Sequence, residues 1–506
     1  MTQAVASTSR QSSLVFPEAP SAARTVWLVA LRELTDQMTS LRFLIVALLA
    51  VGLTPLAIYV GARDFKNRLA EYDRLQVEKQ KQLWKDGPTE VGDRENLLLL
   101  RAVRAPEPLS VLVRGLDAAM PAYWDFSTAG IASGPSASRP RRLADVLGQL
   151  DMEFLVRVVL GLLAILLAFD AVVGEKELGT LRAVLSQSLA RPAFLGGKLA
   201  GGAVTLLVPL AASFLVALLS AKLFGVDLLG AHALAKTALL LAASAAYLLC
   251  FYALGLLISC LTTSQRTSLV VLLVTWVIGV LAIPPLATFV AQAVAPAPPA
   301  YAIEAQKAAL AEQIHRDTAR EMGEIYARIG GERAFSDPNV YDQNKQAIAQ
   351  AVAPVMATSI NKRRRLLGEI DNDAERHEEH QKEVSALLMA LSPSATFARA
   401  TADLAGTGDA LYAAWLEGVR RQQSRLDSTL FGDPVFLTFV DQSGGTAMAF
   451  ARRKPPILSQ LPMFVPPRGD ALTALARALP SLGLLIAYTG IFVVGGFIAF
   501  ARYDVR

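Results

Sequence analysis

Cysteine and charge are both scarce in this 506-residue sequence. The two cysteines, Cys250 and Cys260, are too few for a disulfide framework or a cysteine-based zinc cluster. Charged residues make up 18% of the chain and hydrophobic residues 53%, whereas a soluble domain carries about 25% charge. This composition excludes an ordinary soluble enzyme. The 49 basic residues nearly balance the 44 acidic ones, so the chain lacks the basic surplus of a nucleic-acid-binding protein.

Several catalytic motifs are also missing from the sequence. It contains no G-x-x-x-x-G-K-[ST] phosphate loop, because Gly197–Lys198 is followed by Leu199 and lacks the upstream glycine. It contains no H-E-x-x-H pair and no G-x-S-x-G elbow, which leaves a membrane-embedded hydrolase with little support. We therefore expect no enzyme activity and no ATP hydrolysis by this chain alone.

Long apolar runs are what the sequence does contain. A membrane-spanning helix needs about 20 largely apolar residues. Windows that meet this requirement lie at residues 43–60, 154–173, 199–219, 233–261, 268–290 and 479–500. They predict an all-α polytopic membrane protein with six transmembrane helices. The fifth window could instead be a buried core helix, but its uncharged length of about 34 Å is enough to cross a bilayer.

Basic residues in the short connections predict the orientation. They precede the first window, lie between the second and third and between the fourth and fifth, and close the chain: Arg24, Arg32, Arg42, Lys176, Arg182, Arg191, Lys198, Arg266, Arg502 and Arg506. Residues 1–20 lack the pattern of a cleavable signal peptide. We expect a multi-pass membrane protein with both termini in the cytoplasm, so that segments 61–151 and 291–477 lie outside.

The two outer segments are predicted to form a mainly helical extracytoplasmic domain. Helical periodicity runs through residues 301–329 and 342–391, and one candidate strand covers 435–440. The sequence HEEH at 377–380 is a metal-like cluster, but its charged surroundings favour a solvated helix face. Arg157 and Asp170 fall near the ends of the second window; Asp170 could pair with Arg182 or with a partner subunit.

The most informative stretch connects the second and third windows and reads FDAVVGEKELGTLRAVLSQSLARPAFLGGKLAGG. Glu175, Lys176 and Glu177 are polar enough to lie in water, Gly179 permits a bend, and Thr180 can cap the next helix. On these grounds alone, an ordinary solvated loop between two spans explains the stretch equally well.

This stretch resembles the coupling loop of type-2 ABC exporter permeases. The family pattern is Glu-x-Glu-x-Gly-Thr-Leu, then a short helix, a Ser/Arg turn and Gly-Lys at re-entry. In this sequence it falls on Glu175, Glu177, Gly179, Thr180, Leu181, Arg191, Gly197 and Lys198, with Arg182 following Leu181. The chain departs from the family at Ser188, where proline is common, and at Ala190, where serine is common. The departures concern the shape of the turn.

Other parts of the chain resemble the same family. The segment VWLVALRELTDQMTSLRFLI, with Arg32 and Glu33, is similar to the interfacial elbow helix before the first span. The ending FARYDVR is also typical. The large insert before the last window, with LSPSATFARATADLAGTG at 391–408, resembles a subgroup related to gliding-motility and copper-site-maturation permeases.

The resemblance implies a division of the chain into six parts. These are a cytoplasmic N-terminus with the elbow helix (1–42), the first span (43–60), an outer segment (61–151), spans two to five with a coupling loop at 174–198 (152–290), a large outer domain (291–477), and the sixth span with the C-terminus (478–506). Glu175 to Arg182 would carry ATPase coupling, and Arg32 and Glu33 would belong to the elbow helix.

The resemblance also implies the partners. These are an ABC ATPase subunit that holds ATP and Mg, a second identical or related permease, membrane lipid and, for the outer domain, a periplasmic protein; no nucleic acid, metal or cofactor is expected on this chain. An alternative function remains open: a membrane-anchored scaffold or mechanotransmission subunit whose outer domain acts on a periplasmic partner without solute transport.

Overall fold

The structure is a computed structural model of the whole chain. It describes residues 22–85, 100–117, 120–127, 130–133, 150–186, 190–329, 338–431, 436–442, 445–451, 464, 466–467 and 469–503. Residues 134–149, the position of Ser188 and both ends of the chain lie outside these residues.

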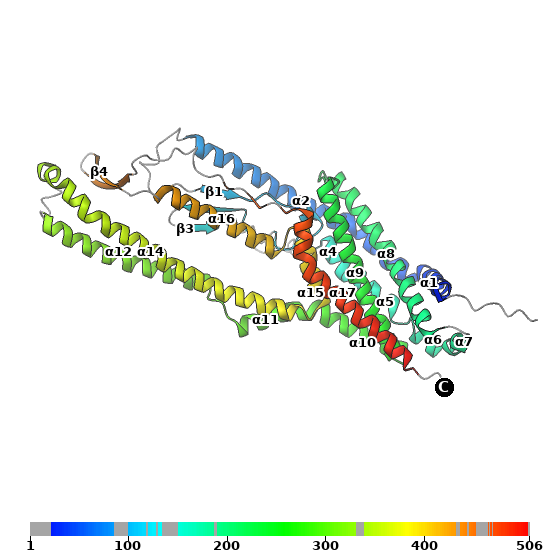
Figure 1. The fold of residues 1–506 in the computed structure, drawn as a ribbon. Coiled ribbons are helices and arrows are strands. Elements are labelled where there is room, and N and C mark those ends of the chain that lie inside the picture. The colour runs from blue at the N-terminus through cyan, green and yellow to red at the C-terminus, as the bar shows by residue number, and fades with distance from the viewer. Residues whose placement is uncertain are drawn as a thin grey trace, which may run out of the picture.

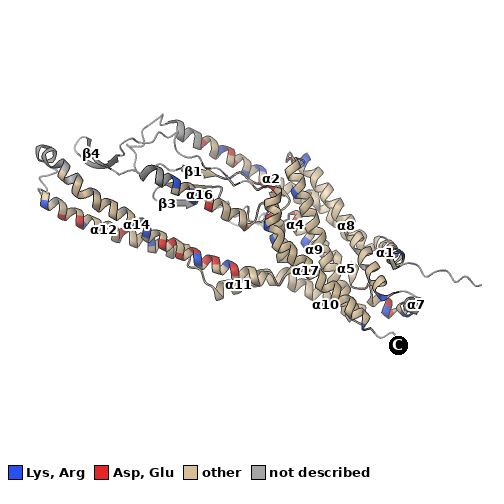
Figure 2. Cartoon of the chain, viewed as in Figure 1, with Lys and Arg blue, Asp and Glu red and all other residues tan. Residues whose placement is uncertain are grey.

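Six helical segments are long and apolar enough to cross a membrane, as the hydropathy predicts. They run over Leu41–Glu78, Met152–Glu177, Arg191–Leu223, Ala231–Leu261, Gln265–Val294 and Ala471–Ala501. Their side chains form one continuous apolar core in a bundle at one end of the molecule (Figure 1). Charged residues are sparse on this bundle and frequent on the helices that project from it (Figure 2). The chain is therefore a multi-pass membrane protein with a mainly helical fold.

The bundle is built from the following elements. A separate helix α1 (Ala22–Met38) precedes α2 (Leu41–Lys85), and the second span is composed of α4 (Met152–Phe154), η3 (Leu155–Leu160), α5 (Gly161–Ala168) and α6 (Val173–Glu177). The short α7 (Thr180–Ser186) leads to α8 (Arg191–Leu223) and α9 (Ala231–Leu261). The fifth span comprises α10 (Gln265–Val277), η4 (Ile278–Ala282) and α11 (Ile283–Val294), and the sixth is α17 (Ala471–Ala501).

The bundle has two distinct ends. We call the end with residues 174–198 the loop end and the opposite one the domain end. The described chain starts near the loop end with α1 and finishes there after α17 (Figure 1). The helix α2 has 45 residues, about 68 Å, so it continues beyond the bundle at the domain end.

A projecting domain extends from the domain end. Its main feature is a hairpin of two long helices, α12 (Ala300–Ile329) and α14 (Pro338–Met389), which pack along each other. Two shorter helices follow, α15 (Pro393–Ala405) and α16 (Asp409–Phe431). With 52 residues, α14 is about 78 Å long and reaches well past the bundle (Figure 1).

The sequence predicts mainly helices in the two segments between the spans, and residues 100–133 add a small antiparallel sheet that the sequence analysis does not predict. Its strand order is β1 (Leu100–Val103), β2 (Tyr123–Ser127) and β3 (Gly130–Ser133). The short helix η2 (Pro108–Val111) lies in the connection between β1 and β2. The sheet packs on α16, where Trp124 and Trp415 stack with ring centroids 5.8 Å apart. Burial of these large rings gives the sheet a small core of its own.

The candidate strand at 435–440 becomes part of a two-stranded ribbon. β4 (Phe436–Gln442) pairs antiparallel with β5 (Gly445–Ala451). The alternation of residue types identified only the first of the two strands.

The helix α15 joins the projecting domain to the bundle. It packs against α9 and α17, and Phe397 stacks on Tyr247 of α9 with ring centroids 4.4 Å apart. Ser392 caps its first turn by accepting the Ala395 amide, and Gly406 ends it with a positive φ of 75°. Residues beyond the helix contact the first outer segment, since the Leu116 amide donates to the Thr407 carbonyl (2.8 Å). Both outer segments therefore meet the bundle at α15.

One carboxyl group on α15 is buried without a full set of partners. Asp403 is largely inaccessible and its Oδ1 has no hydrogen-bond partner. Burial, with a further contribution from the charge of Asp409, raises the pKa of Asp403 to about 6. A carboxyl whose pKa is higher in the folded state favours folding when it is protonated, and this contribution is lost as the pH rises through 6.

Asp403→Asn should therefore stabilise the protein at pH 8 and have little effect at pH 4, because the amide resembles the protonated acid. A shift of about two pKa units corresponds to at most about 3 kcal/mol. We expect the melting temperature in detergent to rise at pH 8 by about 2 to 6 °C. The exposed Asp373→Asn serves as control, and an equal effect of Asp403→Asn at both pH values would contradict the assignment.

Candidate functional site

The loop between the second and third spans forms a compact cap on the loop end of the bundle. After α6 the chain turns at Gly179, whose φ of 70° suits glycine, and enters α7. Thr180 is the first residue of α7, and its hydroxyl donates to the Glu175 carbonyl (3.4 Å). The chain returns to the bundle at Arg191, where α8 begins.

A buried lysine connects this loop to two other helices. Lys198 of α8 is only 5% exposed. Its Nζ lies 2.9 Å from Glu175 Oε1 on α6 and 2.8 Å from Glu33 Oε2 on α1. A buried ammonium needs such partners, because removing a charge from water is costly. The three side chains thus join α1, α6 and α8 through one cation.

Two glycines allow α1 to approach α8 this closely. A Cβ on Gly197 would lie 2.6 Å from Val29 Cβ, and a Cβ on Gly201 would lie 2.7 Å from the Ala30 carbonyl oxygen. The four-residue spacing places both glycines on one face of α8, so the two backbones can meet, as small residues permit between helices in membranes. Without this close packing, Glu33 could not reach Lys198.

The ion pairs continue into a buried hydrogen-bond network. Gln37 Nε2 donates to Glu33 Oε1 (2.6 Å) and to the Tyr252 hydroxyl (3.1 Å). The Tyr252 hydroxyl in turn donates to the Lys198 carbonyl (3.2 Å). A side chain at Gly202 would overlap the Tyr252 ring, so glycine is required there. The network therefore also includes α9.

Lys176 and Glu177, which follow Glu175 in the loop, are hydrogen-bonded to the ends of neighbouring helices. Lys176 Nζ donates to the Cys260 carbonyl and to the Thr262 carbonyl (3.0 Å), at the C-terminus of α9. Glu177 Oε1 accepts the Gln265 amide (2.9 Å) at the start of α10. Ser259 Oγ accepts the amides of Val172 and Val173, at 3.0 and 2.9 Å. These bonds fix the loop to the C-terminal end of α9 and to the start of α10.

The candidate residues of the loop separate into two groups. Glu175 points inward to Lys198, and Leu181 is 1% exposed. Glu177, Gly179, Thr180 and Arg182 are exposed. Of the elbow residues, Arg32 is exposed and pairs with Asp36 (3.7 Å), whereas Glu33 is turned into the bundle. The candidate residues therefore face two directions that the sequence pattern did not distinguish.

Two residues that matter here were not among the candidates for coupling. Leu178 is 76% exposed at the turn, so it places a large apolar side chain among the polar residues of the loop tip. Lys198 was recognised only as part of the re-entry motif, although it holds both acidic partners. The signal for Lys198 was present, since a lysine inside an apolar span is rare and usually paired.

Two other charged residues in the spans are also paired. Asp170 accepts a hydrogen bond from Arg42 Nη1 (2.9 Å) at the loop end, so the structure gives it a partner within the chain other than Arg182. Arg157 lies 3.3 Å from Glu153, near the domain end of the second span. The cavity that Glu153 lines, beside the second pair, measures only about 10 Å³.

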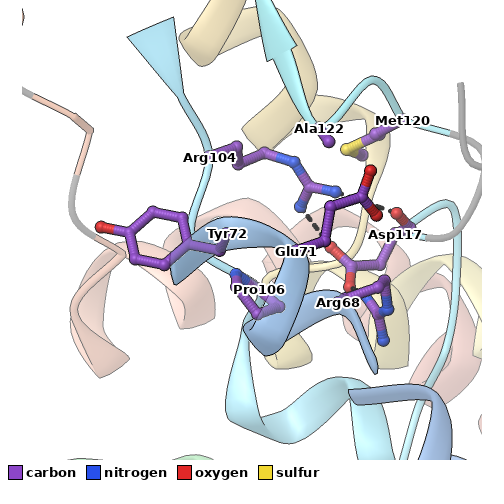
Figure 3. A pocket seen from close by; sticks show the side chains of 8 residues that line it. All are labelled: Arg68, Glu71, Tyr72, Arg104, Pro106, Asp117, Met120 and Ala122. Atoms are coloured by element: carbon purple, nitrogen blue, oxygen red, sulfur yellow. Dashed lines mark hydrogen bonds and ion pairs between the residues drawn. The ribbon is translucent and has the colours of Figure 1, made fainter. Parts of the chain in front are cut away.

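A second polar cluster lies at the base of the projecting domain (Figure 3). Asp117, whose side chain is fully buried, pairs with Arg104 and with Arg68 of α2. Arg104 Nη2 also donates to the Asp117 carbonyl (2.9 Å). Burial lowers the pKa of Arg104 to about 10, so it stays charged at neutral pH. The adjoining cavity of about 20 Å³ is the size of one water molecule. This cluster joins α2 to the sheet and offers no room for a substrate.

The HEEH segment shows no metal-binding geometry. His377 Nδ1 lies 2.8 Å from the Asp373 carbonyl, one turn earlier on α14, and His380 is exposed. Among the residues that the structure describes, no three His, Cys, Asp or Glu side chains are grouped to hold a metal ion. Cys250 and Cys260 are both free and buried.

Comparison with known protein families identifies the family of this chain. The family model described as ABC-2 family transporter protein matches residues 27–505, which is nearly the whole chain. No curated protein matches the sequence.

Lys198→Met should destabilise the fold, because Glu33 and Glu175 would then face each other without a cation. Breaking a buried ion pair costs about 3–5 kcal/mol. We expect a clear fall in the melting temperature in detergent, whereas the exposed Lys222→Met on the same helix should have no such effect. Combining Lys198→Met with Glu33→Gln and Glu175→Gln should restore much of the loss. An unchanged melting temperature for Lys198→Met alone would show that the ion pairs do not hold α1 and the loop together.

Proposed function

This chain belongs to the ABC-2 transporter family, and we propose that it is a permease subunit that moves a substrate across or out of the bacterial inner membrane. ATP would be hydrolysed by a separate ABC ATPase subunit, the partner that membership in this family implies. The sequence itself contains no phosphate loop.

The observation that carries the proposal is the construction of the loop at 174–198. Its tip, Leu178 to Thr180 together with Arg182, is exposed, with Leu178 presenting an apolar side chain to the surroundings. Its base is bonded to α1, α8, α9 and α10 through Glu175, Lys176 and Glu177. A partner that moved the tip would therefore displace several spans together. This is what a coupling element between an ATPase and a membrane domain requires.

The tip and the base have different roles in this proposal. Leu178 would contact the ATPase subunit, since a large exposed apolar side chain suits the centre of a docking surface. Glu175 would act inside the permease by transmitting displacement through Lys198 to α1. Leu181 anchors α7 to the bundle. The two roles can be separated by mutation.

We further propose that the loop end faces the cytoplasm, where the ATPase subunit would reside. The basic residues of the short connections favour this orientation. The projecting domain then lies on the outer side of the membrane. The α1 helix exposes Trp27, Leu28 and Leu31 along one face, which suits a position in the lipid interface.

A second permease, identical or related, would complete the transporter. Three spans expose large apolar side chains along most of their length, namely those formed by α2, by α10 to α11, and by α17. In a membrane these faces contact lipid or another apolar helix. A second permease would cover some of these apolar faces, and lipid would contact the rest.

The length of the projecting helices favours an alternative function, mechanotransmission without solute transport. The hairpin of α12 and α14 reaches about 78 Å from its base, and α2 runs without interruption from the bundle into the projecting domain. Such an arrangement could act on a periplasmic protein without moving a solute. Substrate accumulation in inverted vesicles that contain both subunits separates the two functions, because only a transporter produces it.

Leu178→Asp should prevent the partner ATPase from binding, because it places a charge in an apolar contact. We expect co-purification of the co-expressed ATPase to fall by about tenfold or more. Glu175→Ala should leave binding largely intact but reduce the stimulation of ATP hydrolysis by the permease. Leu229→Asp, in an exposed turn at the domain end, is the control. If Leu178→Asp binds the ATPase normally, the loop tip is not the docking surface.

The orientation is tested by labelling a single cysteine. Glu383 of α14 is exposed and lies on the projecting domain. Glu383→Cys, in a chain without Cys250 and Cys260, should react with a membrane-impermeant maleimide in intact spheroplasts. A cysteine at Arg182 should react only after the membrane is broken. The reverse pattern would place the projecting domain in the cytoplasm.

A further inference from the structure

The fifth span contains a π-helical segment next to two prolines. The Ile283 amide donates to the Ile278 carbonyl, five residues earlier, which defines the π register of η4. The next bond in this register would join the amide of residue 284 to the Gly279 carbonyl. Pro284 has no amide hydrogen, so the Gly279 carbonyl needs another donor. An unpaired carbonyl inside an apolar bundle is strongly unfavourable.

The donor comes from the connection between α14 and α15. The Ser392 hydroxyl donates to the Gly279 carbonyl, and Ser392 is 0% exposed. The same oxygen accepts the Ala395 amide (3.1 Å) at the start of α15. One serine thus satisfies the carbonyl freed by the proline and caps the helix that follows the hairpin.

The base of the hairpin is held at a second point close by. The Tyr488 hydroxyl of α17 donates to the Ala390 carbonyl, two residues before Ser392. The C-terminal part of α14 also packs along α11. The returning helix of the hairpin is therefore bonded to both the fifth and the sixth spans within three residues.

A small rotation at the base of the hairpin produces a large displacement at its far end. A rotation of roughly 10° moves residue 320, which lies about 30 Å along α12, by about 5 Å. The π segment offers a defined way to produce such a change. If it returned to the α register, the Ile283 amide would donate to the Gly279 carbonyl in place of the Ser392 hydroxyl.

We propose that Ser392 is a positioning residue that holds the fifth span in its π-helical form and thereby sets the angle of the α12–α14 hairpin. Breaking the bond between Ser392 and Gly279 allows the span to change register and the hairpin to rotate. The Ser392 hydroxyl thus links the projecting domain to the fifth span at the carbonyl that Pro284 leaves without an amide donor. This inference concerns the domain end and does not depend on the identity of the ATPase or the substrate.

The test measures the angle of the hairpin in the full-length protein in nanodiscs. Spin labels are placed at Leu229→Cys and Arg320→Cys in a chain without Cys250 and Cys260, and their distance distribution is recorded by double electron–electron resonance. Ser392→Ala should shift or broaden the distribution relative to the parent. Ser392→Thr keeps the hydroxyl and should reproduce the parent distribution. Ser213→Ala, which removes a buried hydroxyl without a hydrogen-bond partner, is the matched control.

Pro284→Ala separates this role from simple capping of α15. It supplies an amide hydrogen to the fifth span but does nothing for the Ala395 amide. The double variant Ser392→Ala, Pro284→Ala should therefore recover the parent distribution. The proposal is wrong if Ser392→Ala gives the parent distribution, or if the double variant remains as broad as Ser392→Ala alone. A Ser392→Ala protein too unstable to label would also overturn it, unless Pro284→Ala restores the folded protein.

Discussion

The buried ammonium of Lys198 is the constraint on which the loop end of the bundle depends. A lysine inside an apolar bundle must have anionic partners within reach, and it obtains them from α1 and α6. This requirement brings together two segments that lie about 140 residues apart in the chain, the elbow helix and the loop after the second span. The close contact of α1 with Gly197 and Gly201, and the hydrogen bonds of Gln37 and Tyr252, follow from the same arrangement.

The rest of the bundle shows a related feature: specific side chains bond the free backbone groups at three helix ends or interruptions. Ser259 accepts the amides that begin α6, Lys176 donates to the last carbonyls of α9, and Ser392 donates to the carbonyl that Pro284 leaves free. In an apolar environment water cannot supply these bonds. The interruptions therefore join the spans to the loop at one end and to the projecting domain at the other.

Sequence reasoning located the spans well and the outer sheet poorly, for physical reasons. An uncharged run of twenty residues has few alternatives to a spanning helix. The strands of residues 100–133 have only four or five residues each, and their core depends on Trp415 of the distant α16. Such a sheet has no strong local pattern, because its burial is supplied by another part of the chain. The loop residues were found through resemblance, but periodicity could not show that Glu175 faces inward and Leu178 outward.

The sequence alone determined six apolar spans, a polar loop at 174–198 and a long helical insert, since these depend on composition and local periodicity. The tertiary structure decided which charges are partners: Lys198 with Glu33 and Glu175, Asp170 with Arg42, and Asp117 with Arg68 and Arg104. It also placed the Ser392 hydroxyl, which follows α14, against a carbonyl of the fifth span more than one hundred residues earlier in the chain. Pairing between distant residues depends on how the helices pack, which local sequence does not specify.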